Sequence, residues 1–134
     1  MAAYLLDTNH LGLAVDSQSL VAQRVFESRL RGNRFGTCIP VLCEIEAGIR
    51  QLGRPQRYRR NLNHLLRQVR IWPIDLKTAR LYGDIFQELR RRGRVLSQVD
   101  IMLAALARQM GLTLLSTDRD FEAVRGLRTA DWSV

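Results

Sequence analysis

Four acidic residues stand beside short apolar stretches at widely separated points of the chain: Asp7, Glu44, Asp100 and Asp118. Carboxylates with apolar neighbours are poorly solvated, and they repel one another if the fold gathers them. A divalent cation between them removes that repulsion, and hard cations prefer oxygen ligands. The pattern therefore predicts a metal-dependent hydrolase of phosphate esters.

Length and composition narrow the class of protein. A chain of 134 residues is expected to form one domain, residues 1–134, with a core of its own. No apolar run reaches the roughly 18 residues that span a bilayer, and the start lacks a secretion signal, so we expect a cytoplasmic protein without membrane contact. Neither the two cysteines nor the two histidines have the spacing of a zinc site.

The formal net charge is +8, and arginine supplies nearly all the positive charge because Lys77 is the only lysine. A guanidinium group grips phosphate oxygens in pairs, which favours a polyanion as partner. A solvated basic surface is the alternative. Charge alone does not distinguish DNA, RNA and an acidic protein. Among the arginines around the middle helices and after the long one, we predict contacts to a nucleic-acid backbone for Arg50, Arg54, Arg57, Arg91 and Arg92.

Apolar runs and turn residues predict alternating strands and helices. The expected strands cover residues 3–6, 34–39, 69–74, 112–115 and 127–130, and the expected helices cover about 16–31, 40–53, 58–66, 76–92 and 97–110. This alternation predicts an α/β fold with right-handed crossovers and a parallel sheet covered on both faces. Ligands of such sheets bind beyond the carboxyl ends of the strands, where one rim can hold all four acids.

The chain resembles the PIN-domain ribonucleases, and within them the VapC-type toxins, over almost its whole length. The matching motifs are LLDTN at 5–9, IPVLCEIEAG at 39–48, DIMLAA at 100–105 and LLSTDRDF at 114–121. Each motif alone is weak, but all four occur in the family's order. The resemblance implies a three-layer α/β/α PIN domain with a central, mainly parallel sheet of about five strands.

The resemblance also implies an endoribonuclease that uses Mg²⁺ or Mn²⁺. It assigns Asp7, Glu44, Asp100 and Asp118 to the catalytic metal site, with Asp7 and Asp100 as the surest direct ligands. Asp120 is an auxiliary acid that can take the place of Asp118.

Three polar residues have supporting roles in the same family pattern. Asn9 is similar to the residue that steadies the first acid. Ser116 is similar to the hydroxyl that places the fourth, where many members have threonine. Because Thr117 is next in the chain, which of the two hydroxyls orients the acid stays open.

The resemblance further implies three partners: structured RNA such as tRNA or ribosomal RNA, a VapB-type antitoxin that covers the active groove, and a second copy in a homodimer. It thus implies that RNA is the nucleic acid that the arginines contact. Leu52, Tyr58 and Leu62 would suit an antitoxin helix laid in a groove, and a core role for them is an equal alternative.

Other interpretations of the same residues compete with a nuclease. Asp7 and Asp118 can be helix or turn caps, Glu44 can be a first-turn acid, and Asp100 can pair with an arginine. A phosphotransfer fold of receiver or haloacid-dehalogenase type is disfavoured, because Asn9 stands where an aspartate is needed and the only lysine lies at a helix start. A basic RNA-binding domain without catalysis and a PIN nuclease for RNA maturation without antitoxin remain as alternatives.

Overall fold

The computed structural model describes all 134 residues, and its centre is one five-stranded sheet. The strands are β1 (Ala3–Leu6), β2 (Arg34–Thr37), β3 (Arg70–Ile71), β4 (Thr113–Leu115) and β5 (Thr129–Ala130). They lie in the order β3-β2-β1-β4-β5, and all four neighbouring pairs are parallel. The predicted parallel sheet of five strands is confirmed.

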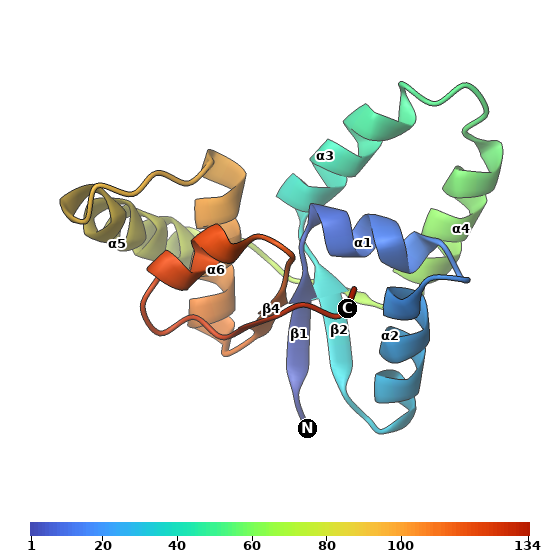
Figure 1. The fold of residues 1–134 in the computed structure, drawn as a ribbon, viewed down its shortest axis with the longest axis horizontal. Coiled ribbons are helices and arrows are strands. Elements are labelled where there is room, and N and C mark those ends of the chain that lie inside the picture. The colour runs from blue at the N-terminus through green and yellow to red at the C-terminus, as the bar shows by residue number, and fades with distance from the viewer.

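Six α-helices and one 3₁₀ helix connect the strands. They are α1 (Thr8–Val15), α2 (Leu20–Leu30), α3 (Ile39–Ile49), α4 (Gln56–Leu66), α5 (Leu76–Arg91), α6 (Gln98–Met110) and η1 (Arg119–Ala123). In Figure 1, α5 and α6 lie to one side of the strands while α1, α2 and α4 lie to the other, as expected for an α/β/α arrangement. None of the helices combines the length and the apolar character that crossing a membrane requires.

Capping residues explain why the last two helices start and stop where the sequence predicts. Asp75 and Thr78 form a capping box at the start of α5, each bonding the other's backbone N–H. The Ser97 side chain caps α6, and Gly111 ends it in the left-handed conformation with φ of 66°. These local signals fix the boundaries because they satisfy backbone groups that the helix leaves free.

Three parts of the predicted element pattern are wrong. The strand predicted at residues 69–74 covers only Arg70–Ile71, because its pairing with β2 involves these two residues alone. The hydrophobic pattern assigns no helix to residues 8–15, where the structure has α1. Eight residues give little more than two turns, too few for a helical period to stand out. The predicted strand at residues 34–39 ends at Thr37, because Cys38 becomes the N-terminal cap residue of α3.

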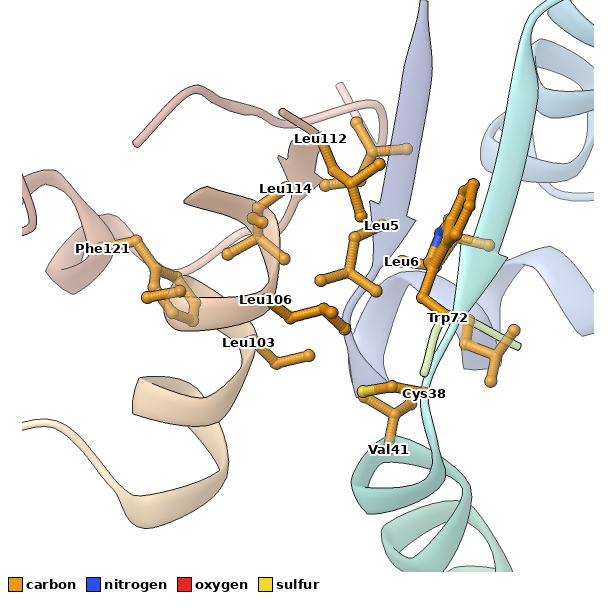
Figure 2. Packing of buried hydrophobic residues seen from close by; sticks show 14 of the residues in the cluster. Leu5, Leu6, Cys38, Val41, Trp72, Leu103, Leu106, Leu112, Leu114 and Phe121 are labelled. Carbon is orange, nitrogen blue, oxygen red and sulfur yellow. The ribbon is translucent and has the colours of Figure 1, made fainter. Parts of the chain in front are cut away.

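The core is built around the two central strands. Leu5 and Leu6 of β1 and Leu114 of β4 are fully buried, and Figure 2 shows Leu5 and Leu114 on the side of Leu103 and Leu106 of α6, with Leu6 toward Trp72. Burying a leucine side chain stabilises a fold by about 1.5–3 kcal/mol. The ends of β1 and β4, which precede Asp7 and Asp118, are therefore fixed in the core.

Candidate active site

Two of the four acids leave the sheet at the point where its strand order reverses. The chain builds β2 and β3 on one side of β1 and then returns to place β4 on the other side. Such a switch point is where α/β sheets bind ligands. Asp7 follows β1 directly, and its backbone N–H donates to the carbonyl oxygen of Leu115 at the end of β4 (3.2 Å). Asp118 follows three residues after β4.

Asp7 and Asp118 are both capping residues, as the competing interpretation predicts. Oδ1 of Asp7 accepts from the backbone N–H of His10 (2.7 Å) and caps α1. Oδ1 of Asp118 accepts from the backbone N–H of Asp120 (2.8 Å) and caps η1. In each case Oδ2 has no hydrogen bond within the protein, so the cap fixes the carboxylate and leaves one oxygen for a ligand.

The other two acids come from helices on opposite sides of that point. Glu44 lies in the second turn of α3, and its Oε1 accepts a hydrogen bond from the hydroxyl of Thr8 at the start of α1. Asp100 lies in the first turn of α6 and is half-buried. No arginine forms an ion pair with Asp100, so the interpretation of this residue as one half of a salt bridge is wrong.

The charges of the three other acids act on Asp100. Burial raises the pKa of the Asp100 carboxyl, and the negative charges of Asp118, Glu44 and Asp7 raise it further, against an opposing hydrogen bond from Ser97. Like charges have this effect only at short range. Asp100 therefore lies within electrostatic range of acids from three other segments of the chain.

The donor set fits a hard divalent cation. Every candidate ligand is a carboxylate oxygen, which suits Mg²⁺ or Mn²⁺. The mutual repulsion at Asp100 is uncompensated by any arginine, and a cation would relieve it. No three of these groups are already spaced as a formed metal site. Asp7 is the one of the four acids that is buried, and it also caps α1.

The hydroxyls beside the fourth acid divide their roles. Oγ of Ser116 accepts from the backbone N–H of Asp118 (3.0 Å), so it places that acid. Thr117 instead accepts from the side-chain amide of Asn9 (3.2 Å). Asn9 therefore ties the start of α1 to the segment after β4 and makes no hydrogen bond to Asp7.

Asp120 is directed away from the other acids. Its side chain is 63% exposed, and its Oδ1 lies 3.9 Å from the guanidinium of Arg94. Its charge is not among those that raise the pKa of Asp100, whereas the charge of Asp118 is. The geometry favours Asp118 over Asp120 as the fourth acid.

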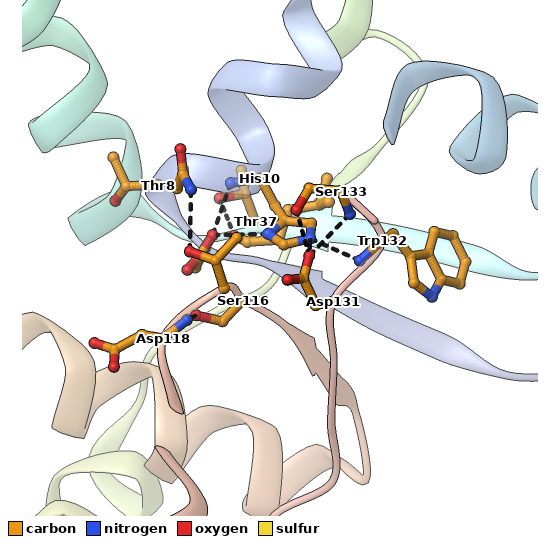
Figure 3. Close-up of polar contacts among 12 residues, drawn as sticks. Thr8, His10, Thr37, Ser116, Asp118, Asp131, Trp132 and Ser133 are labelled. Carbon is orange, nitrogen blue, oxygen red and sulfur yellow. Dashed lines mark hydrogen bonds and ion pairs between the residues drawn. The ribbon is translucent and has the colours of Figure 1, made fainter. Parts of the chain in front are cut away.

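Two polar residues at this site were not predicted from the sequence. Thr8 bonds Glu44, and His10 is fully buried with Nδ1 3.5 Å from Oδ1 of Asp7. Figure 3 shows His10 beneath the turn of α1, between the acid-bearing strand ends and the C-terminal residues. The available signal was the position of His10 three residues after Asp7, a spacing at which helical side chains meet.

The arginines predicted to bind RNA differ in whether their guanidinium groups already have partners within the fold. Arg54, Arg57 and Arg91 are exposed and form no ion pair or side-chain hydrogen bond. Arg50 pairs with Glu46 (3.2 Å), and Arg92 donates to the backbone carbonyl of Ala123. One nitrogen atom of Arg92 therefore has a structural role.

The predicted antitoxin contacts are partly wrong. Leu62 is 1% exposed and belongs to the core, Tyr58 is half-buried, and only Leu52 is exposed. A cavity of about 720 Å³ lies between α2 and α4, and its mixed polar and apolar lining includes Phe26 and Leu65. Phe26 is 58% exposed, which is unusual for so large an apolar side chain.

Comparison with known proteins agrees with this geometry. The PIN-domain family profile matches residues 4–127. Ribonuclease VapC2 of Haemophilus influenzae is 31% identical and aligns over 98% of this chain and 99% of its own length. The tRNA(fMet)-specific endonuclease VapC of Shigella flexneri is 30% identical over 99% of this chain and 100% of its own. The crystal structure of DNA-bound VapBC from Salmonella typhimurium has a TM-score of 0.85 at 25% identity, covering 98% of this chain and 99% of that one.

The chain therefore belongs to the PIN-domain family, within its VapC-type branch. The three-layer α/β/α fold expected from the sequence motifs is confirmed.

Proposed function

We propose that this protein is a metal-dependent endoribonuclease, the toxin of a toxin–antitoxin pair, which hydrolyses phosphodiester bonds in structured RNA. The observation that supports this most is the set of three carboxylates whose charges act on Asp100 at the switch point of the sheet. The relatives named as ribonucleases support the reaction class. A relative named as specific for tRNA(fMet) makes tRNA the first substrate to test, with ribosomal RNA second.

Asp7 and Asp100 are the proposed direct ligands of Mg²⁺ or Mn²⁺, with Glu44 and Asp118 completing the site. A divalent cation supplies activation of water and neutralisation of the charge that develops on the phosphate. The protein orients the ligands: the α1 cap fixes Asp7, and Ser116 holds the backbone of Asp118. Asp120 is proposed to make no direct contact with the cation.

RNA binding is assigned to the basic surface. Arg54, Arg57 and Arg91 present unpaired guanidinium groups, and Arg91 lines a polar pocket with Arg92 and Arg125. Contacts of this kind act on the phosphate backbone, so affinity should fall steeply as salt rises. They position the RNA and leave sequence recognition to other features.

The proposed protein partners are a VapB-type antitoxin and a second copy of this chain. The solved relative contains toxin and antitoxin together, which supports the first. The cavity between α2 and α4 is a candidate groove for an amphipathic antitoxin helix, with exposed Phe26 and half-buried Leu65 as its apolar contacts among polar neighbours. Arg29 and His64 at its border would favour an acidic segment of the antitoxin.

Brief expression in cells, followed by sequencing of RNA 5′ ends, tests the function. We expect growth arrest and new ends at one or a few sites in the wild type, and neither with Asp7→Asn. Growth should recover when the small protein encoded beside this chain is co-expressed. New ends without growth arrest would favour a maturation nuclease, and no new ends would favour a non-catalytic RNA-binding domain.

A further inference from the structure

A fully buried histidine lies between the candidate site and the C-terminal residues. Nδ1 of His10 is 3.5 Å from Oδ1 of Asp7, and Nε2 is 3.5 Å from Oδ1 of Asp131. Nε2 also accepts from the backbone N–H of Trp132 (3.1 Å), as Figure 3 shows. The imidazole thus joins the first strand end to a segment more than 120 residues further along the chain.

The hydrogen bond to Nε2 assigns the ring proton. Because the Trp132 N–H donates to Nε2, that atom carries a lone pair and the proton of the neutral ring sits on Nδ1. Nδ1 is buried and has no hydrogen-bond partner in the fold. A buried donor without a partner costs about 1–3 kcal/mol, so such groups are rare unless they have a use. This donor faces the Asp7 carboxylate.

The segment that holds the ring is itself firmly attached. Oδ1 of Asp131 accepts from the backbone N–H and the hydroxyl of Ser133 (2.8 and 2.6 Å). The Trp132 ring packs on Tyr4 and Phe35, with centroids 4.9 and 5.5 Å apart. Its carbonyl oxygen accepts from Arg24 (3.2 Å). Residues 131–133 are therefore anchored on β1, β2 and α2 and set the position of Nε2.

We propose that His10 is a positioning residue for Asp7 and that residues 131–133 position His10. In the fold the Nδ1–H of His10 faces, at 3.5 Å and without a formed hydrogen bond, the carboxylate oxygen that already caps α1. Its electrostatic attraction would hold that oxygen in place and leave Oδ2 of Asp7 available to a cation. Groups that hydrogen-bond a ligating carboxylate orient it, and their loss costs about 10–100-fold in metal affinity. This inference rests on the proposed metal-dependent function and adds to it the role of the C-terminal segment.

Two substitutions of His10 separate its two nitrogen atoms. In His10→Asn the side-chain amide occupies the place of Nδ1 and can still donate to Asp7. In His10→Gln the longer amide reaches the place of Nε2, where its oxygen can accept from the Trp132 N–H, and Asp7 loses its donor. His64→Gln, a change of an exposed histidine, is the matched control.

The measurement is Mn²⁺ affinity by titration calorimetry without RNA, with thermal unfolding to verify that each variant is folded. We expect His10→Gln to bind Mn²⁺ about 10–100-fold more weakly. His10→Asn should stay within about threefold of the wild type, and His64→Gln should be unchanged. Equal affinities in His10→Gln and the wild type, or equal losses in both His10 variants, would overturn the proposal.

Trp132→Ala tests the part played by the C-terminal segment. It should weaken Mn²⁺ binding in the wild type and add little in the His10→Gln background, because both changes act through one ring. Independent, additive effects would contradict the proposed chain of contacts. If the wild type itself bound no Mn²⁺, the proposed function would fail and this inference with it. If the wild type bound and every variant bound equally, only this inference would fail.

Discussion

The hydroxyl of Thr8 donates a hydrogen bond to Oε1 of Glu44 and so joins the first residue of α1 to the second turn of α3. The same arrangement recurs at Asp7 and Asp118, where one carboxylate oxygen accepts a hydrogen bond from the fold. Three of the four acids therefore use one oxygen for orientation, and the other oxygen has no hydrogen bond within the protein. Structural and functional roles coexist in the same side chain.

Removing the Thr8 hydroxyl should slow cleavage without weakening RNA binding. Thr8→Val keeps the shape of the side chain but removes the hydrogen bond to Glu44. The loss of such an orienting group typically lowers metal affinity or activity by about 10–100-fold. Single-turnover cleavage rates at saturating protein measure the effect. Thr8→Ser should restore most of the rate, and a Thr8→Val protein as fast as the wild type would show that Glu44 needs no support.

Asp118 and Asp120 form a matched pair for testing the fourth acid. Asp118→Asn should reduce the cleavage rate by at least about tenfold, since it removes a charge that acts on Asp100. Asp120→Asn should stay within about threefold, because this residue is exposed and lies near Arg94. If Asp120→Asn lowered the cleavage rate more than Asp118→Asn, Asp120 would be the fourth acid of the site.

Asp100→Asn should stabilise the metal-free protein while it abolishes cleavage. The pKa of Asp100 is raised in the fold by burial and by neighbouring acids, so the folded state holds its proton more tightly than the unfolded state does. Stability then falls as the pH rises from the ordinary aspartate pKa through the raised one. At neutral pH, Asn should raise the unfolding free energy by about 1 kcal/mol.

Thermal unfolding at neutral and acidic pH measures this effect. The advantage of Asp100→Asn should shrink as the pH falls toward the ordinary aspartate range, where the wild-type carboxyl is protonated. Added Mn²⁺ should stabilise the wild type more than the variant, since binding to the folded state adds stability. A metal-free variant less stable than the wild type at neutral pH would contradict the repulsion described here.

The free arginines should govern the salt dependence of RNA binding. Replacing Arg54 and Arg57 together by glutamine leaves up to two RNA phosphates without a cationic partner. The slope of log affinity against log salt should then fall by about 0.7–0.9 for each phosphate that the protein no longer neutralises. Lys77→Gln serves as the control, because it also removes one positive charge but lies outside the proposed RNA-binding surface. Filter binding at several salt concentrations gives the slopes, and an unchanged slope would place the RNA elsewhere.

The sequence predicted those parts of the fold that local chemistry decides. The limits of α6 follow from Ser97 and Gly111. The common rim expected for the acids rests on Asp7 and Asp118 after strands and on Glu44 and Asp100 near the starts of helices. The helix α1 could not be predicted in the same way, because eight mostly apolar residues show no period. Leu62 illustrates a further limit: helical spacing does not tell which apolar face meets the core and which meets a partner.

The role of His10 lay beyond sequence reasoning for a different reason. Its contacts to Asp131 and Trp132 join residues more than 120 positions apart, and no local motif marks them. Only the parallel pairing of β4 with β1 and β5 brings that segment beneath α1.

The central claim is that acids from four segments form one metal site that cuts RNA. Its most direct test is the cleavage of purified tRNA by the wild type and by Asp7→Asn, each with Mn²⁺ and with excess chelator. RNA binding is measured in parallel. The account predicts cleavage only by the wild type with Mn²⁺ and comparable RNA affinity for both proteins. Cleavage by Asp7→Asn at the wild-type rate, or wild-type cleavage that persists in chelator, would contradict it.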